Sequence, residues 1–207
     1  MSSHRVFDAI VVAGGRGSRL GGVDKPALRI AGQTLLAQAI AAVAAARRVS
    51  VVRAADDVPV DARITRTMEW PARSGPASAI AAGLADLQAS SRNRPPSPFV
   101  AILAADLVRS REAFAALHRH PVPRWADGML AVDAEGRDQP LLAIYRTAAL
   151  RDAVGARATD GLGVSALVAG LALHRIALPG HLCADIDDDA DARAAGIVLP
   201  LATALHG

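Results

Sequence analysis

Short apolar runs alternate along the chain with longer segments in which apolar residues recur every three or four positions. The clearest runs are Ala9–Val12 and Phe99–Leu103, which no polar residue interrupts. Such runs are typical of buried strands in a parallel sheet that is covered on both faces. Helical spacing is found in Thr34–Arg48 and Pro76–Ala89. The alternation predicts a doubly wound α/β fold, in which ligands bind beyond the carboxyl ends of the strands.

Weaker patterns add shorter elements to this sheet. Further strands are expected at Leu28–Ile30, Val49–Arg53, Ile64–Met68, Met129–Val132, Pro140–Tyr145, Leu173–Leu178 and Asp185–Asp187, and further helices at Thr147–Val154, Val164–Val168 and Asp188–Ala195. The strand at Ile64–Met68 has the character of a sheet edge. The turn Glu135–Arg137 separates two extended runs, so we predict an antiparallel hairpin that forms the floor or rim of a second-substrate pocket. Ser90–Pro98 and Arg157–Gly163 are predicted to be flexible loops.

A glycine-rich segment follows the first strand. Five glycines fall among the nine residues 14–22, and Arg16, Arg19 and Lys25 add three cations to the same turn. Glycine lets a backbone turn tightly and lets a phosphate approach its N–H groups closely. The residues expected to cradle a polyphosphate are Ala13, Gly14, Gly15, Arg16, Gly17, Ser18 and Lys25. The alternative is a plain glycine-rich turn between a strand and a helix.

The spacing within this segment excludes two common nucleotide-binding loops. A Walker A loop requires Ser or Thr after its Gly-Lys pair, whereas Lys25 lies between Asp24 and Pro26. A dinucleotide fingerprint requires a third glycine where Leu20 stands, and an acidic residue where Leu35 stands.

Lys25 is the single lysine among 23 basic residues. A compact ammonium on a flexible stem suits one crowded phosphate oxygen better than a planar guanidinium does. We therefore predict a functional role for Lys25, with chance retention of one lysine as the alternative.

Two carboxylates are candidate metal ligands. Asp106 follows the apolar strand Phe99–Leu103, where an isolated charge is costly unless it is paired. Mg²⁺ that bridges nucleotide phosphates is a natural partner, because it takes oxygen ligands from one or two carboxylates. Asp187 is the candidate second ligand. The alternatives are a helix N-cap for Asp106 and a solvated acidic face for Asp187.

Composition narrows the classes of function. The 207 residues suit one domain with an aliphatic core, because 52% are hydrophobic and only 3% are aromatic. Few aromatic residues, scattered arginines and a net charge of +3 argue against binding of nucleic acid. A lone cysteine, Cys183, fits a reducing compartment. The longest uncharged run, Ile30–Ala46, is shorter than the roughly 20 residues of a membrane span, so we expect a soluble cytoplasmic protein.

These motifs together resemble a known family. The segments that carry the resemblance are Val12–Lys25, Gly75-Pro76, Asp106, Gln139–Arg146, Ser165–Val168 and Asp185–Asp187. They are similar to motifs of the molybdenum cofactor guanylyltransferases (the MobA family), nucleotidyltransferases with a GT-A-like fold. The resemblance extends over most of the chain, and the pair Gly14-Gly15 favours guanine over cytosine.

The resemblance implies a Rossmann-like, three-layer α/β/α fold with a mostly parallel sheet and a small antiparallel hairpin. Residues 1–207 would form one nucleotidyltransferase domain, with a nucleotide-binding half at about 6–108 and a second-substrate half at about 109–200. Glu69 is the acid nearest to the position of a base-reading aspartate before Gly75. Loop amides and Arg19 would hold the β- and γ-phosphates, and Lys25 and Asp106 would act at the α-phosphate.

The implied reaction is Mg²⁺-dependent transfer of GMP from GTP to the phosphate of molybdopterin, with release of pyrophosphate. Molybdoenzyme maturation proteins would be further partners. Two alternatives stay open: a related nucleotidyltransferase that uses CTP or a sugar-phosphate acceptor, and a nucleotide-binding protein without catalysis.

Overall fold

A seven-stranded mixed sheet forms the centre of the computed structural model, which describes residues 6–14, 23–53, 61–90, 95–186 and 188–197. Its strands are β1 (Phe7–Val12), β4 (Val49–Val52), β5 (Ile64–Thr67), β6 (Phe99–Ala104), β7 (Gly128–Val132), β8 (Asp138–Arg146) and β9 (Leu173–Ala177). Their order across the sheet is β5-β4-β1-β6-β8-β7-β9. Two short strands, β2 (Arg29–Ile30) and β3 (Gln33–Thr34), pair with each other in a separate antiparallel hairpin.

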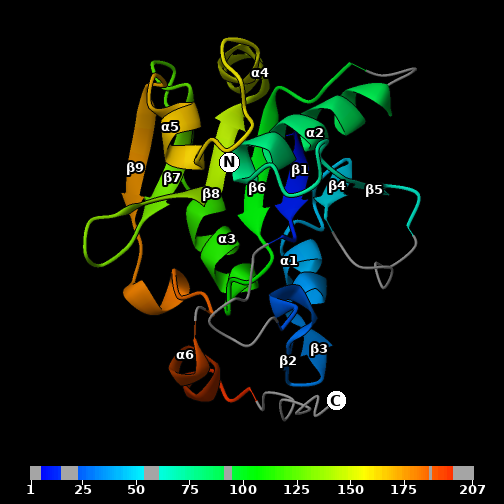
Figure 1. Ribbon diagram of the computed structural model, residues 1–207. Helices are drawn as coiled ribbons and strands as arrows, with labels where there is room; N and C mark the ends of the chain where they lie inside the picture. The colour runs from blue at the N-terminus through cyan, green and yellow to red at the C-terminus, as the bar shows by residue number, and fades with distance from the viewer. Residues whose placement is uncertain (1–5, 15–22, 54–60, 91–94, 187, 198–207) are drawn as a thin grey trace.

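Helices cover both faces of this sheet (Figure 1). The elements are α1 (Leu35–Ala42), α2 (Pro76–Ala89), α3 (Ser110–His118), α4 (Thr147–Gly155), α5 (Val164–Val168) and α6 (Asp189–Ala194), with 3₁₀ turns η2 (Lys25–Ala27) and η3 (Gly180–Leu182). Alternate residues of β1 enter different clusters: Ala9 and Val11 pack with α1 and α3, whereas Ile10 and Val12 pack with α2, α4 and α5. The predicted three-layer α/β/α fold is confirmed.

One strand of the sheet, β8, runs opposite to the other six. β1 pairs in parallel with β4 and β6, and β4 pairs in parallel with β5. β8 runs antiparallel to both β6 and β7, and its pairing with β7 is the predicted hairpin. β7 in turn pairs in parallel with β9. Because β5, β4, β1 and β6 are parallel, their carboxyl ends meet at one edge of the sheet.

Backbone hydrogen bonds continue this ladder past the ends of the strands. The donors and acceptors are Ala13 N and Val52 O (2.9 Å), Ala105 N and Val12 O (3.0 Å), and Arg53 N and Thr67 O (3.0 Å). Residues 13, 53 and 105 are thereby held next to the sheet, and the segments that follow them begin from fixed positions.

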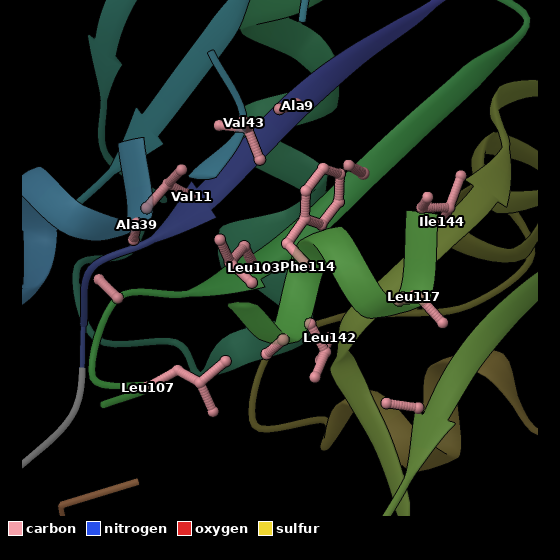
Figure 2. Close-up of a cluster of buried hydrophobic side chains, with 14 of the residues drawn as sticks. Ala9, Val11, Ala39, Val43, Leu103, Leu107, Phe114, Leu117, Leu142 and Ile144 are labelled. Atoms are coloured by element: carbon pink, nitrogen blue, oxygen red, sulfur yellow. The ribbon is translucent and has the colours of Figure 1, made fainter. Parts of the chain in front are cut away.

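The cluster on the α1 and α3 face holds both helices against the sheet (Figure 2). The labelled side chains are Ala9, Val11, Ala39, Val43, Leu103, Leu107, Phe114, Leu117, Leu142 and Ile144. Most are aliphatic, as the composition predicts. Leu107 extends this cluster to the carboxyl edge, which anchors the chain immediately after Asp106.

A third, smaller cluster lies beyond the carboxyl ends of the parallel strands, where Figure 1 shows α6 and the β2–β3 hairpin. Its buried residues are Leu28, Leu35, Ile186, Ala192 and Ile197. Residues near the two ends of the chain therefore pack together, and they support η2, the turn that carries Lys25.

The end predicted for the first helix and the strand predicted at 185–187 are both wrong. The first helix ends at Ala42 rather than at Arg48, because the chain is already joining the sheet: Arg47 N donates to Phe7 O, and Ala9 N donates to Arg48 O, each at 2.9 Å. In the described part of the predicted strand at 185–187, Asp185 forms only an isolated antiparallel bridge with Leu107.

Among the described residues, no helix combines the length and the apolar character that crossing a membrane would need.

Candidate functional site

The carboxyl edge of the parallel strands brings together Lys25 and Asp106, which are far apart in sequence. Lys25 begins η2, and its carbonyl accepts a hydrogen bond from Leu28 N at 3.0 Å. Asp106 lies two residues beyond the end of β6. Lys25 Nζ is 3.9 Å from Asp106 Oδ2. The two residues predicted to act at the same phosphate are therefore neighbours.

The environment of this ion pair is partly enclosed. The Lys25 side chain is 8% exposed, and that of Asp106 is 25% exposed. A separation of 3.9 Å is too long for a direct hydrogen bond, so the two charges attract each other without a fixed bond between them. At this distance a protein interior transmits the attraction far better than water does. The buried ammonium of Lys25 is suited to attract an anionic group, and the more exposed carboxylate of Asp106 is suited to attract a cation.

The structure also tests the alternative role for Asp106. The N-cap of α3 is Arg109, and no side chain caps that terminus. Asp106 is therefore not the cap of the following helix, and the N-cap interpretation is wrong.

The donor set at Asp106 suits a hard cation, because its partly exposed carboxylate supplies oxygen ligands of the kind that Mg²⁺ prefers. Within the described ranges, no group of three or more His, Cys, Asp and Glu side chains forms a ready-made metal cage. Mg²⁺ usually keeps several waters and binds through one or two carboxylates together with substrate phosphates, so Asp106 alone is enough for a candidate site. Asp187, the predicted second ligand, lies outside the described residues.

A second polar group lies at the ends of β1, β4 and β5. Arg53 follows β4, and its Nε is 2.7 Å from Glu69 Oε1. The same oxygen accepts a hydrogen bond from the backbone N–H of Arg73 at 2.8 Å. The Glu69 side chain is 1% exposed and that of Arg53 is 19% exposed. The ion pair is therefore largely removed from water.

Gly14 lies against this ion pair. A Cβ built at Gly14 would come within 2.5 Å of Arg53 Cδ and 2.9 Å of Arg53 Nε. Real side chains do not tolerate such contacts with a neighbour that is itself held in place. In this structure, the close approach that glycine permits at position 14 is made by an arginine side chain.

Gly75 is the N-cap of α2 and has a φ of 99°, a left-handed conformation that favours glycine. The loop at 159–163 packs beside it: Gly161 N donates to Ser74 O at 2.8 Å, and Ala77 N donates to Leu162 O at 3.4 Å. The loop predicted to be flexible is thus hydrogen-bonded to the start of α2.

Of the predicted site residues, Lys25 and Asp106 form one group, and Gly14 and Glu69 form a second through Arg53. Ala13 joins them at the end of β1. Six predicted residues, Gly15, Arg16, Gly17, Ser18, Arg19 and Asp187, lie outside the described part of the chain. Sequence reasoning missed Arg53, although its position directly after a buried parallel strand is the signal that singled out Asp106.

A cavity of about 640 Å³ lies elsewhere, between α1, α3, η3 and α6. Its described lining includes Arg109, Glu112 and His181 but not Lys25, Asp106 or Arg53. Among the described residues, it shares no lining side chain with the two groups described above, although Val108 and Asp185 bring it close to the chain that follows Asp106.

The mostly parallel sheet with helices on both faces, and the charged pairs at the carboxyl edge of its parallel strands, define an α/β protein. The family model described as "MobA-like NTP transferase domain" matches residues 9–175, and the chain belongs to this family. The predicted family and the predicted nucleotidyltransferase class are confirmed. Among curated proteins, no sequence matches the chain.

Solved structures of similar fold include nucleotidyltransferases with different named substrates. Molybdopterin-guanine dinucleotide biosynthesis protein A from Archaeoglobus fulgidus is 14% identical, with a TM-score of 0.61 over 91% of this chain and 96% of that one. The inositol-1-phosphate CTP transferase from T. maritima is 13% identical, with a TM-score of 0.65 over 95% and 96% of the two chains. The 2-C-methyl-D-erythritol 4-phosphate cytidylyltransferase from Thermus thermophilus is 22% identical, with a TM-score of 0.58 over 92% and 97% of the two chains. At these identities the likeness shows the fold.

Proposed function

We propose that this protein is a Mg²⁺-dependent molybdenum cofactor guanylyltransferase. It transfers GMP from GTP to the phosphate of molybdopterin and releases pyrophosphate. The observation that carries the proposal is the Lys25–Asp106 pair, with 3.9 Å between Nζ and Oδ2, at the carboxyl edge of a MobA-like fold.

In this reaction the acceptor phosphate attacks the α-phosphate of GTP, and negative charge develops between them. Such a transfer depends on positioning and on charge neutralisation rather than on a covalent intermediate. The ammonium of Lys25 is preorganised by η2 and is only 8% exposed, so it stabilises that charge in a poorly hydrated place. The amides of the glycine loop, together with Arg19, hold the β- and γ-phosphates.

Asp106 and Asp187 are the residues that would hold Mg²⁺. The ion would supply charge neutralisation at the phosphates when it is bound. The first half of the domain, about 6–108, binds the nucleotide. The second half, about 109–200, which includes the antiparallel pair β7 and β8, binds the acceptor. The protein acts in the cytoplasm, and its product passes to molybdoenzyme maturation proteins.

The test is pyrophosphate release by the purified full-length chain with each of the four nucleoside triphosphates, Mg²⁺ and molybdopterin. We expect release with GTP and molybdopterin together, and none when either is omitted. Release with CTP and a sugar phosphate would assign the protein to another branch of the same fold. Binding of GTP without release under any condition would show a nucleotide-binding protein without catalysis.

A further inference from the structure

A short stretch of chain before α6 is attached to the loop that carries Asp106. The backbone N–H of Val108 donates to Ala184 O at 3.1 Å, and Asp185 forms an antiparallel bridge with Leu107. Leu107 directly follows the carboxylate residue in sequence, and its side chain is anchored in the core that α1 and α3 share with the sheet. These contacts hold the stretch beside the loop that follows the candidate metal ligand.

The next residue, Ile186, packs on the side of the lysine. It is fully buried, in one cluster with Leu28 and Leu35. Leu28 is the C-cap of η2: its N–H donates to Lys25 O at 3.0 Å, and its carbonyl accepts from the N–H of Leu35 at 2.9 Å. Ile186 therefore packs in the apolar cluster that supports the turn carrying the ammonium.

Three consecutive residues thus join the two loops of the charged pair, with hydrogen bonds to one loop and apolar packing to the other. Lys25 Nζ and Asp106 Oδ2 are 3.9 Å apart, which is too long for a hydrogen bond. Their separation therefore depends on how the two backbone segments are held. Closely packed interiors respond to the loss of even one methylene group. A displacement of about 1 Å at a reacting centre can cost about 10²-fold in rate.

We propose that Ile186 is a positioning residue that maintains the separation of Lys25 and Asp106. It acts through Leu28 and the turn η2 rather than through contact with a reactant. α6 supports it, because Ala192 packs in the same cluster. This inference rests on the proposed function, since it concerns the two groups that act at the α-phosphate.

The first measurement does not depend on turnover, because Lys25 is the only lysine in the chain. Acetylation of the folded full-length protein, followed by mass spectrometry, reports how often this 8% exposed side chain becomes accessible. A lysine-containing peptide added to the reaction is the internal reference. For Ile186→Ala we expect labelling of Lys25 to rise by about fivefold or more, because lost packing favours local opening of the turn. For Ile186→Val, a smaller truncation, labelling should stay within about twofold of the wild type.

Ile176→Ala is the matched control. It makes the same truncation at a buried position in β9, the outermost strand of the sheet. It should lower the free energy of unfolding in urea as Ile186→Ala does, but leave labelling of Lys25 within about twofold of the wild type. An equal rise of labelling in both alanine variants would show a general effect of lost stability, and it would overturn the inference.

Turnover supplies the second arm, as kcat at saturating GTP and molybdopterin. Ile186→Ala should lower kcat by about 10-fold to 100-fold, whereas Ile186→Val should retain it within about threefold. In a Lys25→Ala background, Ile186→Ala should lower kcat by no more than about twofold further, because the group that it positions is absent. A purely structural role would lower kcat by the same factor in both backgrounds, which would contradict the inference.

If Ile186→Ala does not fold, Leu28→Ala removes packing from the same cluster on the side of the turn and carries the same expectations. Unchanged labelling of Lys25 in whichever of these variants folds overturns the inference. A wild type that releases no pyrophosphate contradicts the proposed function. If labelling of Lys25 still rises in Ile186→Ala and not in Ile176→Ala, the positioning of Lys25 by Ile186 stands.

Discussion

Lys25 and Asp106 show how much a single side chain can contribute once the fold has placed it. The ammonium is held by the first turn after the glycine segment, and the carboxylate is held by the central strand. The catalytic role that we propose for them requires both residues together. Their separation of 3.9 Å makes them one electrostatic unit.

Replacing Lys25 by Ala should lower kcat by roughly 10²-fold or more, because it removes an electrostatic contribution of about 3 kcal/mol to the transition state. Lys25→Arg should not restore kcat, since the side chain has 8% exposure and a guanidinium needs more room. The measurement is kcat at saturating GTP and molybdopterin, with circular dichroism to confirm folding. Near-normal turnover of Lys25→Ala would remove this residue from the mechanism.

Asp106→Asn tests the proposed cation site, because it keeps the size of the side chain and removes its charge. We expect the Mg²⁺ concentration that gives half-maximal activity to rise by about tenfold or more. The control is Asp152→Asn, an acid on α4 that is distant from this edge of the sheet. If Mg²⁺ titrations of the two variants coincided with the wild type, Asp106 would not be a ligand.

The sequence indicates Lys25 and Asp106 but not the geometry around Glu69, for a physical reason. A lone lysine and an acid after an apolar strand are visible in the letters of the chain. The positive φ of Arg53 is not visible, because nothing in the residue type requires it. Glu69 could be named from the family pattern, yet its partner and its unpaired oxygen depend on how β4 and β5 end together.

At the scale of elements, α2 depends on a glycine in its interior. A Cβ at Gly83 would lie 2.7 Å from Cγ2 of Ile10, a fully buried residue of β1. The absence of a side chain thus allows α2 to approach the strand that leads into the glycine segment. Helix propensity alone would favour alanine at this position, because glycine in a helix interior is about 1 kcal/mol less favourable than alanine.

Gly83→Ala should therefore destabilise the fold by about 1–3 kcal/mol despite the better helix propensity, because it overpacks the interface between helix and sheet. Gly155→Ala is the matched control, since nothing lies within 4 Å of a Cβ at that position in α4. It should be neutral or slightly stabilising. The free energy of unfolding from urea titration measures both. Equal stability of the two variants would show that α2 moves away from Ile10 at little cost.

Helices and strands could be predicted where a regular pattern of apolar residues extends over many positions. The pattern of β1, β6 and α2 indicated their positions well, because burial on one or both faces dictates it. The end of α1 was not predictable, since Arg47 and Arg48 suit the last turn of a helix. Tertiary hydrogen bonds from the backbone of both residues to β1 override that local preference.

At the scale of the whole molecule, β8 is the one strand that runs opposite to the other six, and it joins β6 to the parallel pair β7 and β9. The pairing of Tyr145 shows this, because it lies opposite Val100 of β6 on one side and Gly128 of β7 on the other. Its side chain is fully buried, and its hydroxyl donates to Pro140 O at 2.9 Å. Any loss of packing at Tyr145 therefore affects the strands on both sides of β8. The order of these elements along the chain could be predicted, but the packing of Ala192 of α6 in one cluster with Leu28 and Leu35 joins distant segments that no local pattern connects.

This position predicts how stability depends on alkaline pH. Burial, with a smaller contribution from the charge of Asp138, raises the pKa of Tyr145 well above its ordinary value of 10.0. The unfolded chain then loses the phenolic proton before the folded protein does. The stabilisation is complete below pH 10.0 and declines as the pH rises beyond it, so the free energy of unfolding should fall in that range. Burial, followed by the charges of Asp133 and Glu135, also raises the pKa of Cys183, which acts in the same direction.

Tyr145→Phe isolates the tyrosine contribution. It should cost about 1 kcal/mol at neutral pH through the lost hydrogen bond, and it should make the decline of stability above pH 10.0 shallower without abolishing it. Because Tyr145 is the only tyrosine in the chain, ultraviolet absorbance of the phenolate reports its titration directly. In the folded protein this absorbance should remain low until the transition that circular dichroism detects as unfolding. A phenolate signal that rises near pH 10.0 while the protein stays folded would show that water reaches the Tyr145 hydroxyl in the native state, which would contradict this prediction.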